Sequence, residues 1–136
     1  VSPDGRWLSY SSNESGVHEV FVRPFPEVES GRVQVSTAGG RMARWSRTGR
    51  ELFYINGNDG LVAVRVRMSP TFAAGVETPL FSVADFVDAV SRTYYDVAPN
   101  GQRFLMVRRF EEADTARARL VMVQNFFEEL RAKVPR

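Results

Sequence analysis

One stretch of the sequence decides the fold, and it reads Ser2-Pro3-Asp4-Gly5-Arg6-Trp7-Leu8-Ser9-Tyr10. Two related stretches follow it, Ser46-Arg47-Thr48-Gly49-Arg50-Glu51-Leu52-Phe53-Tyr54 and Ala98-Pro99-Asn100-Gly101-Gln102-Arg103-Phe104-Leu105-Met106. We call each copy the turn-strand motif, because a tight turn precedes an apolar run typical of a β-strand. The copies begin 44 and then 52 residues apart, and self-similarity at such a spacing indicates a repeat architecture.

The residue types of the motif predict its turn. Pro3 presets the backbone φ of the first corner, and the Asp4 side chain accepts hydrogen bonds from nearby backbone N–H groups. Thr48 and Asn100 hold the position of Asp4 in the other two copies. A glycine that permits a positive φ then follows in every copy, namely Gly5, Gly49 and Gly101. We therefore expect three turns of one geometry.

Short strands are predicted along most of the chain, because apolar and polar residues alternate between turn signals. The expected strands are 7–11, 18–25, 32–37, 42–46, 51–55, 61–68, 79–83, 93–97, 103–107 and 119–124. About four short strands per motif is the pattern of a β-propeller blade. This predicts an all-β chain with blade-like units at about 1–45, 46–97 and 98–124. A β-sandwich has strands of similar length, but the recurring motif favours the propeller.

The end of the chain departs from the strand pattern and predicts a short helix over 125–134. Asn125 is a helix-capping residue, and Glu128 follows at the spacing of a capping partner. Phe127, Leu130 and Val134 fall on one helical face. We expect this helix to cover apolar surface at the end of the repeat array.

Composition limits the classes of function. Hydrophobic residues make up 43% and charged residues 25% of the 136 residues, with a net charge of +2. The charge is too small and too dispersed for a nucleic-acid-binding face. The absence of cysteine excludes disulfides and thiolate metal sites, and no apolar run is long enough for a transmembrane helix. Since the sequence starts with Val1, directly before Ser2 of the first motif and without an initiator Met, we expect it to be a fragment.

The motif and the run Glu19-Val20-Phe21-Val22 that follows it resemble the TolB-like, Pro-Asp propeller repeat of bacteria. Arg44-Trp45-Ser46 resembles the strand that usually precedes the second turn. The resemblance covers residues 1–124 and is degenerate in the third copy, where Ala98 and Asn100 replace Ser and Asp. It implies further N-terminal blades or self-association, because three blades do not close a ring. It also favours an extracytoplasmic, periplasmic location.

The resemblance implies a non-enzymatic module that presents a surface to a protein or a small ligand. The end of the chain, from Asn125 to Leu130, resembles the C-terminus of propellers in large bacterial proteins, many with a serine/threonine kinase domain upstream. We therefore expect the sensor or scaffold part of a signalling protein. Two alternatives remain, namely the propeller of a prolyl-oligopeptidase-like peptidase and a free periplasmic TolB-like transport accessory protein.

No group of residues predicts catalysis, a cofactor or a bound metal. His18 is the single histidine and no Gly-x-Ser-x-Gly elbow is present, so a serine triad is not indicated. Arg44 and Asp96 are the candidate partner-binding residues, because each lies two positions before its motif. In a propeller the strand that enters the turn lies nearest the axis, where partners commonly bind.

Overall fold

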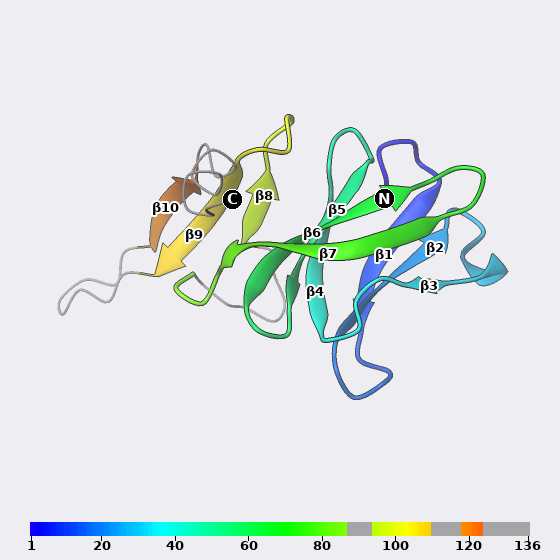
Figure 1. Cartoon of the computed structure of the whole chain (residues 1–136), viewed down its shortest axis with the longest axis horizontal. Helices are drawn as coiled ribbons and strands as arrows, with labels where there is room; N and C mark the ends of the chain where they lie inside the picture. The colour runs from blue at the N-terminus through cyan, green and yellow to red at the C-terminus, as the bar shows by residue number, and fades with distance from the viewer. Residues whose placement is uncertain (87–93, 110–117, 124–136) are drawn as a thin grey trace, which may run out of the picture. The chain divides into compact units, whose positions relative to one another are not determined.

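The structure is a computed structural model that describes residues 1–86, 94–109 and 118–123 (Figure 1). These residues form ten β-strands and one three-residue 3-10 helix, η1 (Val28–Ser30). The predicted all-β class is confirmed, and the helix predicted over 125–134 lies outside the described residues. Within the described ranges, no helix is long and apolar enough to cross a membrane. The strands are β1 (Trp7–Ser12), β2 (Glu19–Pro24), β3 (Val33–Gln34), β4 (Gly40–Trp45), β5 (Glu51–Asn56), β6 (Gly60–Arg67), β7 (Ala73–Ser82), β8 (Tyr95–Val97), β9 (Phe104–Arg109) and β10 (Ala118–Val123).

The strands pair into three antiparallel sheets. The first sheet has the order β1-β2-β3, the second β4-β5-β6-β7 and the third β10-β9-β8. The chain divides into two compact units, an N-terminal unit at residues 1–83 and a C-terminal unit at residues 84–136. The first and second sheets therefore belong to the N-terminal unit, and the third belongs to the C-terminal unit. Among the described residues, the second sheet is the only one with the four strands expected of a propeller blade, and the other two sheets have three strands each.

Each strand that enters a motif pairs with the strand that leaves it. β4 pairs with β5, and β8 pairs with β9. By sheet membership, the second sheet begins at residue 40 with β4, and the third begins at residue 95 with β8. The expected units of 1–45, 46–97 and 98–124 instead place β4 and β8 at the end of the preceding unit. The reason is local, because the motif turn reverses the chain and makes its two flanking strands antiparallel neighbours.

Two strands differ most in length from their predictions. β3 covers only Val33–Gln34, because the Ser36 hydroxyl accepts the N–H of Val20 at 2.7 Å and ends the backbone ladder. β7 begins at Ala73, well before the predicted strand 79–83. Register shifts opposite β6 let this strand continue through Pro79, which has no N–H to donate.

The core of the N-terminal unit lies between the first and second sheets, which pack face to face (Figure 1). Alternation places Val20 and Val22 of β2 on one face, and Leu52 and Tyr54 of β5 on the opposing face. The cluster also contains Val35, Val62, Val64 and Phe72, and Trp7, Ala43, Trp45, Val66, Met68 and Ala74 pack around it.

The three turn-strand motifs share one set of backbone hydrogen bonds. In the first copy Ser2 N–H donates to Trp7 O at 2.7 Å, and Gly5 N–H donates to Ser2 O at 2.9 Å. The same two bonds recur at the corresponding residues of the second and third copies. The expected positive φ is present at all three glycines, namely Gly5 (74°), Gly49 (70°) and Gly101 (70°).

The first residue of the motif adds a side-chain bond in two copies. The buried Ser2 hydroxyl accepts the N–H of Trp7 at 3.0 Å, and the buried Ser46 hydroxyl accepts that of Glu51 at 3.0 Å. The Ser2 hydroxyl also donates to Asp4 at 2.6 Å and lowers the pKa of that carboxyl. The third copy has Ala98 in this position and therefore lacks the side-chain bond.

We expect substitutions at the first motif position to have opposite effects in the second and third copies. Ser46→Ala should lower the free energy of unfolding by about 1–2 kcal/mol, because it leaves the Glu51 N–H without its side-chain acceptor. Ala98→Ser should raise it by about 0.5–1.5 kcal/mol, because it restores that acceptor. Urea denaturation of the three proteins measures both changes, and a shift of the same sign in both variants would contradict the assignment.

Candidate ligand-binding pocket at the third motif

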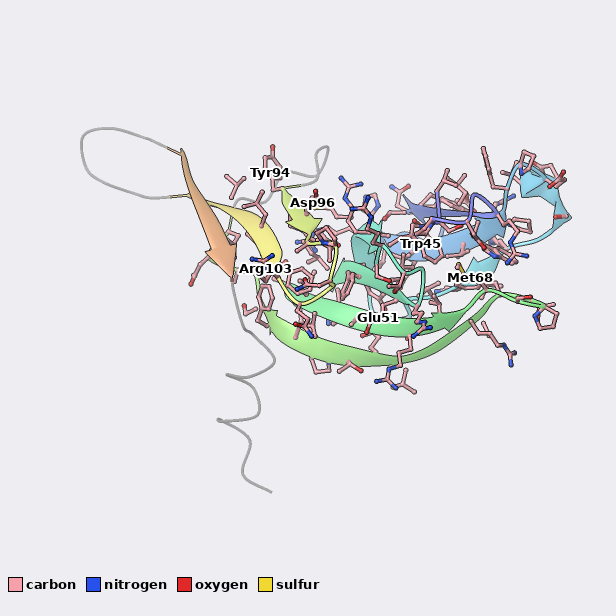
Figure 2. All side chains as sticks on the ribbon, turned by 90° about the horizontal axis from the view of Figure 1, so that it is seen from above. Trp45, Glu51, Met68, Tyr94, Asp96 and Arg103 are labelled. Atoms are coloured by element: carbon pink, nitrogen blue, oxygen red, sulfur yellow. The ribbon has the colours of Figure 1, made fainter. Side chains whose placement is uncertain are left out.

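A pocket of about 240 Å³ lies beside the third motif within the C-terminal unit. Figure 2 shows two of its lining residues, Asp96 on β8 and Arg103 just before β9. Among the described residues, the complete lining is Asp96, Val97, Ala98, Pro99, Arg103, Phe104 and Leu105. Both strands that flank the turn therefore contribute to the pocket, together with the turn itself.

The motif turn holds these residues in place. Ala98 N–H donates to Arg103 O at 2.9 Å, and Gly101 N–H donates to Ala98 O at 2.8 Å. The Asn100 side chain accepts the N–H of Gln102 at 3.1 Å, which is the local bond that its residue type predicts. The walls of the pocket are therefore fixed by a hydrogen-bonded turn and by the backbone pairing of β8 with β9.

The pocket combines an apolar wall with two opposite charges. Phe104 is fully buried, and Leu105 and Val97 are half-buried. Asp96 and Arg103 are exposed, and one Asp96 oxygen accepts the N–H of Val97 at 2.9 Å. An apolar hollow with a few polar groups at its edge is the usual composition of a small-ligand site.

Alignment of the motif copies shows which side chains around the pocket differ between the third copy and the second. Val97 holds the place of Trp45, whose ring packs edge-on against Phe72 with centroids 6.2 Å apart. The third copy thus has a small side chain where the second has an indole. The flanking charges are also exchanged, because Arg44 and Glu51 of the second copy become Asp96 and Arg103 in the third.

The two predicted partner-binding residues occupy equivalent places in separate units. Arg44 on β4 lies opposite Phe53, and Asp96 on β8 lies opposite Leu105. Both side chains are exposed, and Asp96 lines the pocket. Arg103 is not among the partner-binding residues predicted from the sequence, although it is the sixth residue of the motif and aligns with Glu51. An alignment of the copies by charge would have identified it.

His18 and Tyr54 occupy structural positions. His18 is exposed next to β2, and its carbonyl accepts the N–H of Gly40 at 2.7 Å. Tyr54 is fully buried and its hydroxyl donates to Glu77. Burial and this bond raise the pKa of Tyr54 far above its ordinary value, so the phenol stays protonated and holds β5 to β7.

Comparison with known proteins assigns no family to this arrangement, since no protein-family model matches the chain and no curated protein shows significant similarity to it.

Proposed function

We propose that the chain is a non-enzymatic interaction module of β-propeller-type repeats that binds its ligand in the pocket of the third motif. The observation that carries the proposal is the apolar hollow with Asp96 and Arg103 in its lining. The turn-strand motif supports the repeat architecture, because it recurs three times with the same backbone hydrogen bonds. In a larger bacterial signalling protein, such as one with a serine/threonine kinase domain, this module is the sensor or scaffold part.

The pocket lining indicates the chemistry of the ligand. A volume of about 240 Å³ suits one large side chain rather than a dinucleotide, since pockets for drug-sized ligands begin at about 300 Å³. Val97 and Leu105, which are half-buried, offer contact to an apolar body, Asp96 attracts an ammonium group, and Arg103 forms hydrogen bonds to a carboxylate. The ligand class is therefore an apolar amino acid or a peptide end with such a side chain.

We expect charge-selective effects when two phenylalanine derivatives are titrated into the protein. Phenylalanine amide carries only the ammonium group, so Asp96→Asn should weaken its binding roughly tenfold. N-acetylphenylalanine carries only the carboxylate, so Arg103→Gln should weaken its binding by a similar factor. Two-dimensional NMR measures both affinities and reports shift changes at the Val97, Phe104 and Leu105 amides.

Arg44→Gln is the matched control, because Arg44 holds the place of Asp96 in the second sheet. This variant should leave both affinities unchanged. Shift changes that spread over the surface, or affinities that ignore both Asp96 and Arg103, would contradict the proposed site.

A further inference from the structure

The residue directly before the motif differs in size between the second copy and the third. Trp45 holds this place in the second copy, and Val97 holds it in the third. The backbone around the two residues is equivalent, since Trp45 pairs with Leu52 on β5 and Val97 pairs with Phe104 on β9. The two motif turns also close with the same two backbone hydrogen bonds. The two side chains therefore start from corresponding points on the same local backbone.

The indole of Trp45 takes space beside its motif that Val97 does not fill in the third copy. The indole packs against the core cluster of the N-terminal unit and meets the Phe72 ring edge-on, with centroids 6.2 Å apart. Val97 is half-buried, has no ring and lines the pocket. Phe104 is larger than Leu52 and returns part of the lost volume, yet a pocket of about 240 Å³ remains. The pocket therefore adjoins the place that an indole takes in the second copy.

The volume of the pocket suits two fused rings better than a single ring. An apolar cavity of about 150 Å³ holds one benzene ring, and this pocket is larger, at about 240 Å³. Tryptophan is the standard amino acid whose side chain has two fused rings. The pocket thus has room for the kind of side chain that the second copy supplies from its own sequence.

The second copy also shows how such a ring system is held. Nε1 of Trp45 is buried and has no hydrogen-bond partner among the described residues, so the indole is held by contacts of its rings. In the pocket, Val97, Pro99 and Leu105 offer apolar contact of the same kind. Ring size and shape should therefore select the ligand, with no requirement for an indole N–H.

We propose that the pocket of the third motif takes a bicyclic aromatic side chain, that of tryptophan, in the place that the Trp45 indole takes in the second copy. The inference rests on the proposed function, because it names the side chain of the amino acid or peptide end that binds at the same site. Asp96 and Arg103, which line the pocket and are exposed, then contact the charged groups of that residue outside the rings.

Titration of the full chain with three amides, followed by two-dimensional NMR, tests the inference. Tryptophan amide should bind about fivefold tighter or more than phenylalanine amide, because its second ring buries additional apolar area. The amide of 2-naphthylalanine has two fused rings but no N–H, and its affinity should match that of tryptophan amide within about twofold. Each bound amide should shift the backbone resonances of Val97 and Leu105.

Val97→Trp supplies an indole from the chain itself and should weaken the binding of tryptophan amide by about tenfold or more, because the two rings compete for one place. Val76→Trp is the matched control, since Val76 on β7 is 88% exposed. This variant should leave the affinity unchanged. The three affinities of the unaltered chain decide the inference even if Val97→Trp does not fold.

Equal affinity for phenylalanine amide and tryptophan amide would overturn the inference and leave the proposed function standing. Tight binding of tryptophan amide with weak binding of the naphthylalanine amide would also overturn it, since the N–H would then be recognised. Undiminished binding to a folded Val97→Trp chain would show that the rings lie elsewhere. If none of the three amides bound, the proposed function would fail together with the inference.

Discussion

Phe72→Ala is expected to lower the free energy of unfolding of the N-terminal unit by about 3–5 kcal/mol, the usual cost of removing a buried phenylalanine ring. Phe72 is 7% exposed and belongs to the core cluster between the first and second sheets. Its ring lies 5.3 Å from that of Trp7 and 6.2 Å from that of Trp45, between centroids. Without it, the indoles of the two sheets lose their common contact.

Urea denaturation followed by tryptophan fluorescence measures this change, because Trp7 and Trp45 are the two tryptophans of the chain. Val76→Ala is the control in the neighbouring strand β7, where Val76 is 88% exposed. It should change the free energy of unfolding by no more than about 0.5 kcal/mol. A loss below about 1 kcal/mol in Phe72→Ala would contradict its place in the core.

Local features of the fold could be predicted from the sequence because local chemistry determines them. The three motif glycines are needed at a positive φ whatever surrounds them, and the structure has them there. β5 and β6 agree closely with the predicted 51–55 and 61–68. Val62, Val64 and Val66 alternate with other residues along β6, and a tight turn joins β5 to β6.

Features that depend on distant partners could not be predicted in this way. β3 ends early because Ser36 bonds to Val20, sixteen positions back in the chain, and no pattern within the strand signals that bond. The pocket is lined in part by a small residue, Val97, where the second copy has Trp45. Periodicity does not distinguish these two residues, since both are apolar. The replacement of Trp45 by Val97 can be interpreted only when the motif copies are aligned and the contacts of Trp45 are known.

A buried polar cluster joins the loop before β4 to the strands around it. Glu19 at the start of β2 is 6% exposed, and it accepts hydrogen bonds from the Ser36 hydroxyl and from Gly39 N–H, the latter at 3.1 Å. Gly57 N–H donates to Ala38 O at 3.1 Å from the turn between β5 and β6. The loop is therefore bonded to the first sheet on one side and to the second sheet on the other.

Gly40→Ala is expected to destabilise the N-terminal unit by about 3 kcal/mol, since overpacking costs about 1–3 kcal/mol and a disturbed buried hydrogen bond adds to it. An added Cβ would clash with Ser36 Oγ, and it would lie 2.7 Å from Ser36 Cβ and 2.9 Å from a methyl carbon of Val20. Ser36 cannot move away without losing its bonds to Glu19 and to the Val20 N–H. Urea denaturation measures the loss.

Gly60→Ala is the control for the loss of a glycine as such, because its Cβ would meet only the Asn56 side chain, at 3.2 Å or more. The double variant Gly40→Ala with Ser36→Gly identifies the cause. If the clash with Ser36 is responsible, the two changes together should cost at least about 1 kcal/mol less than the sum of the single changes. If the two costs in unfolding free energy are strictly additive, the strain lies elsewhere. If the double variant costs less than the sum, the loop requires Gly40 because the Ser36 hydroxyl is hydrogen-bonded to the buried carboxylate.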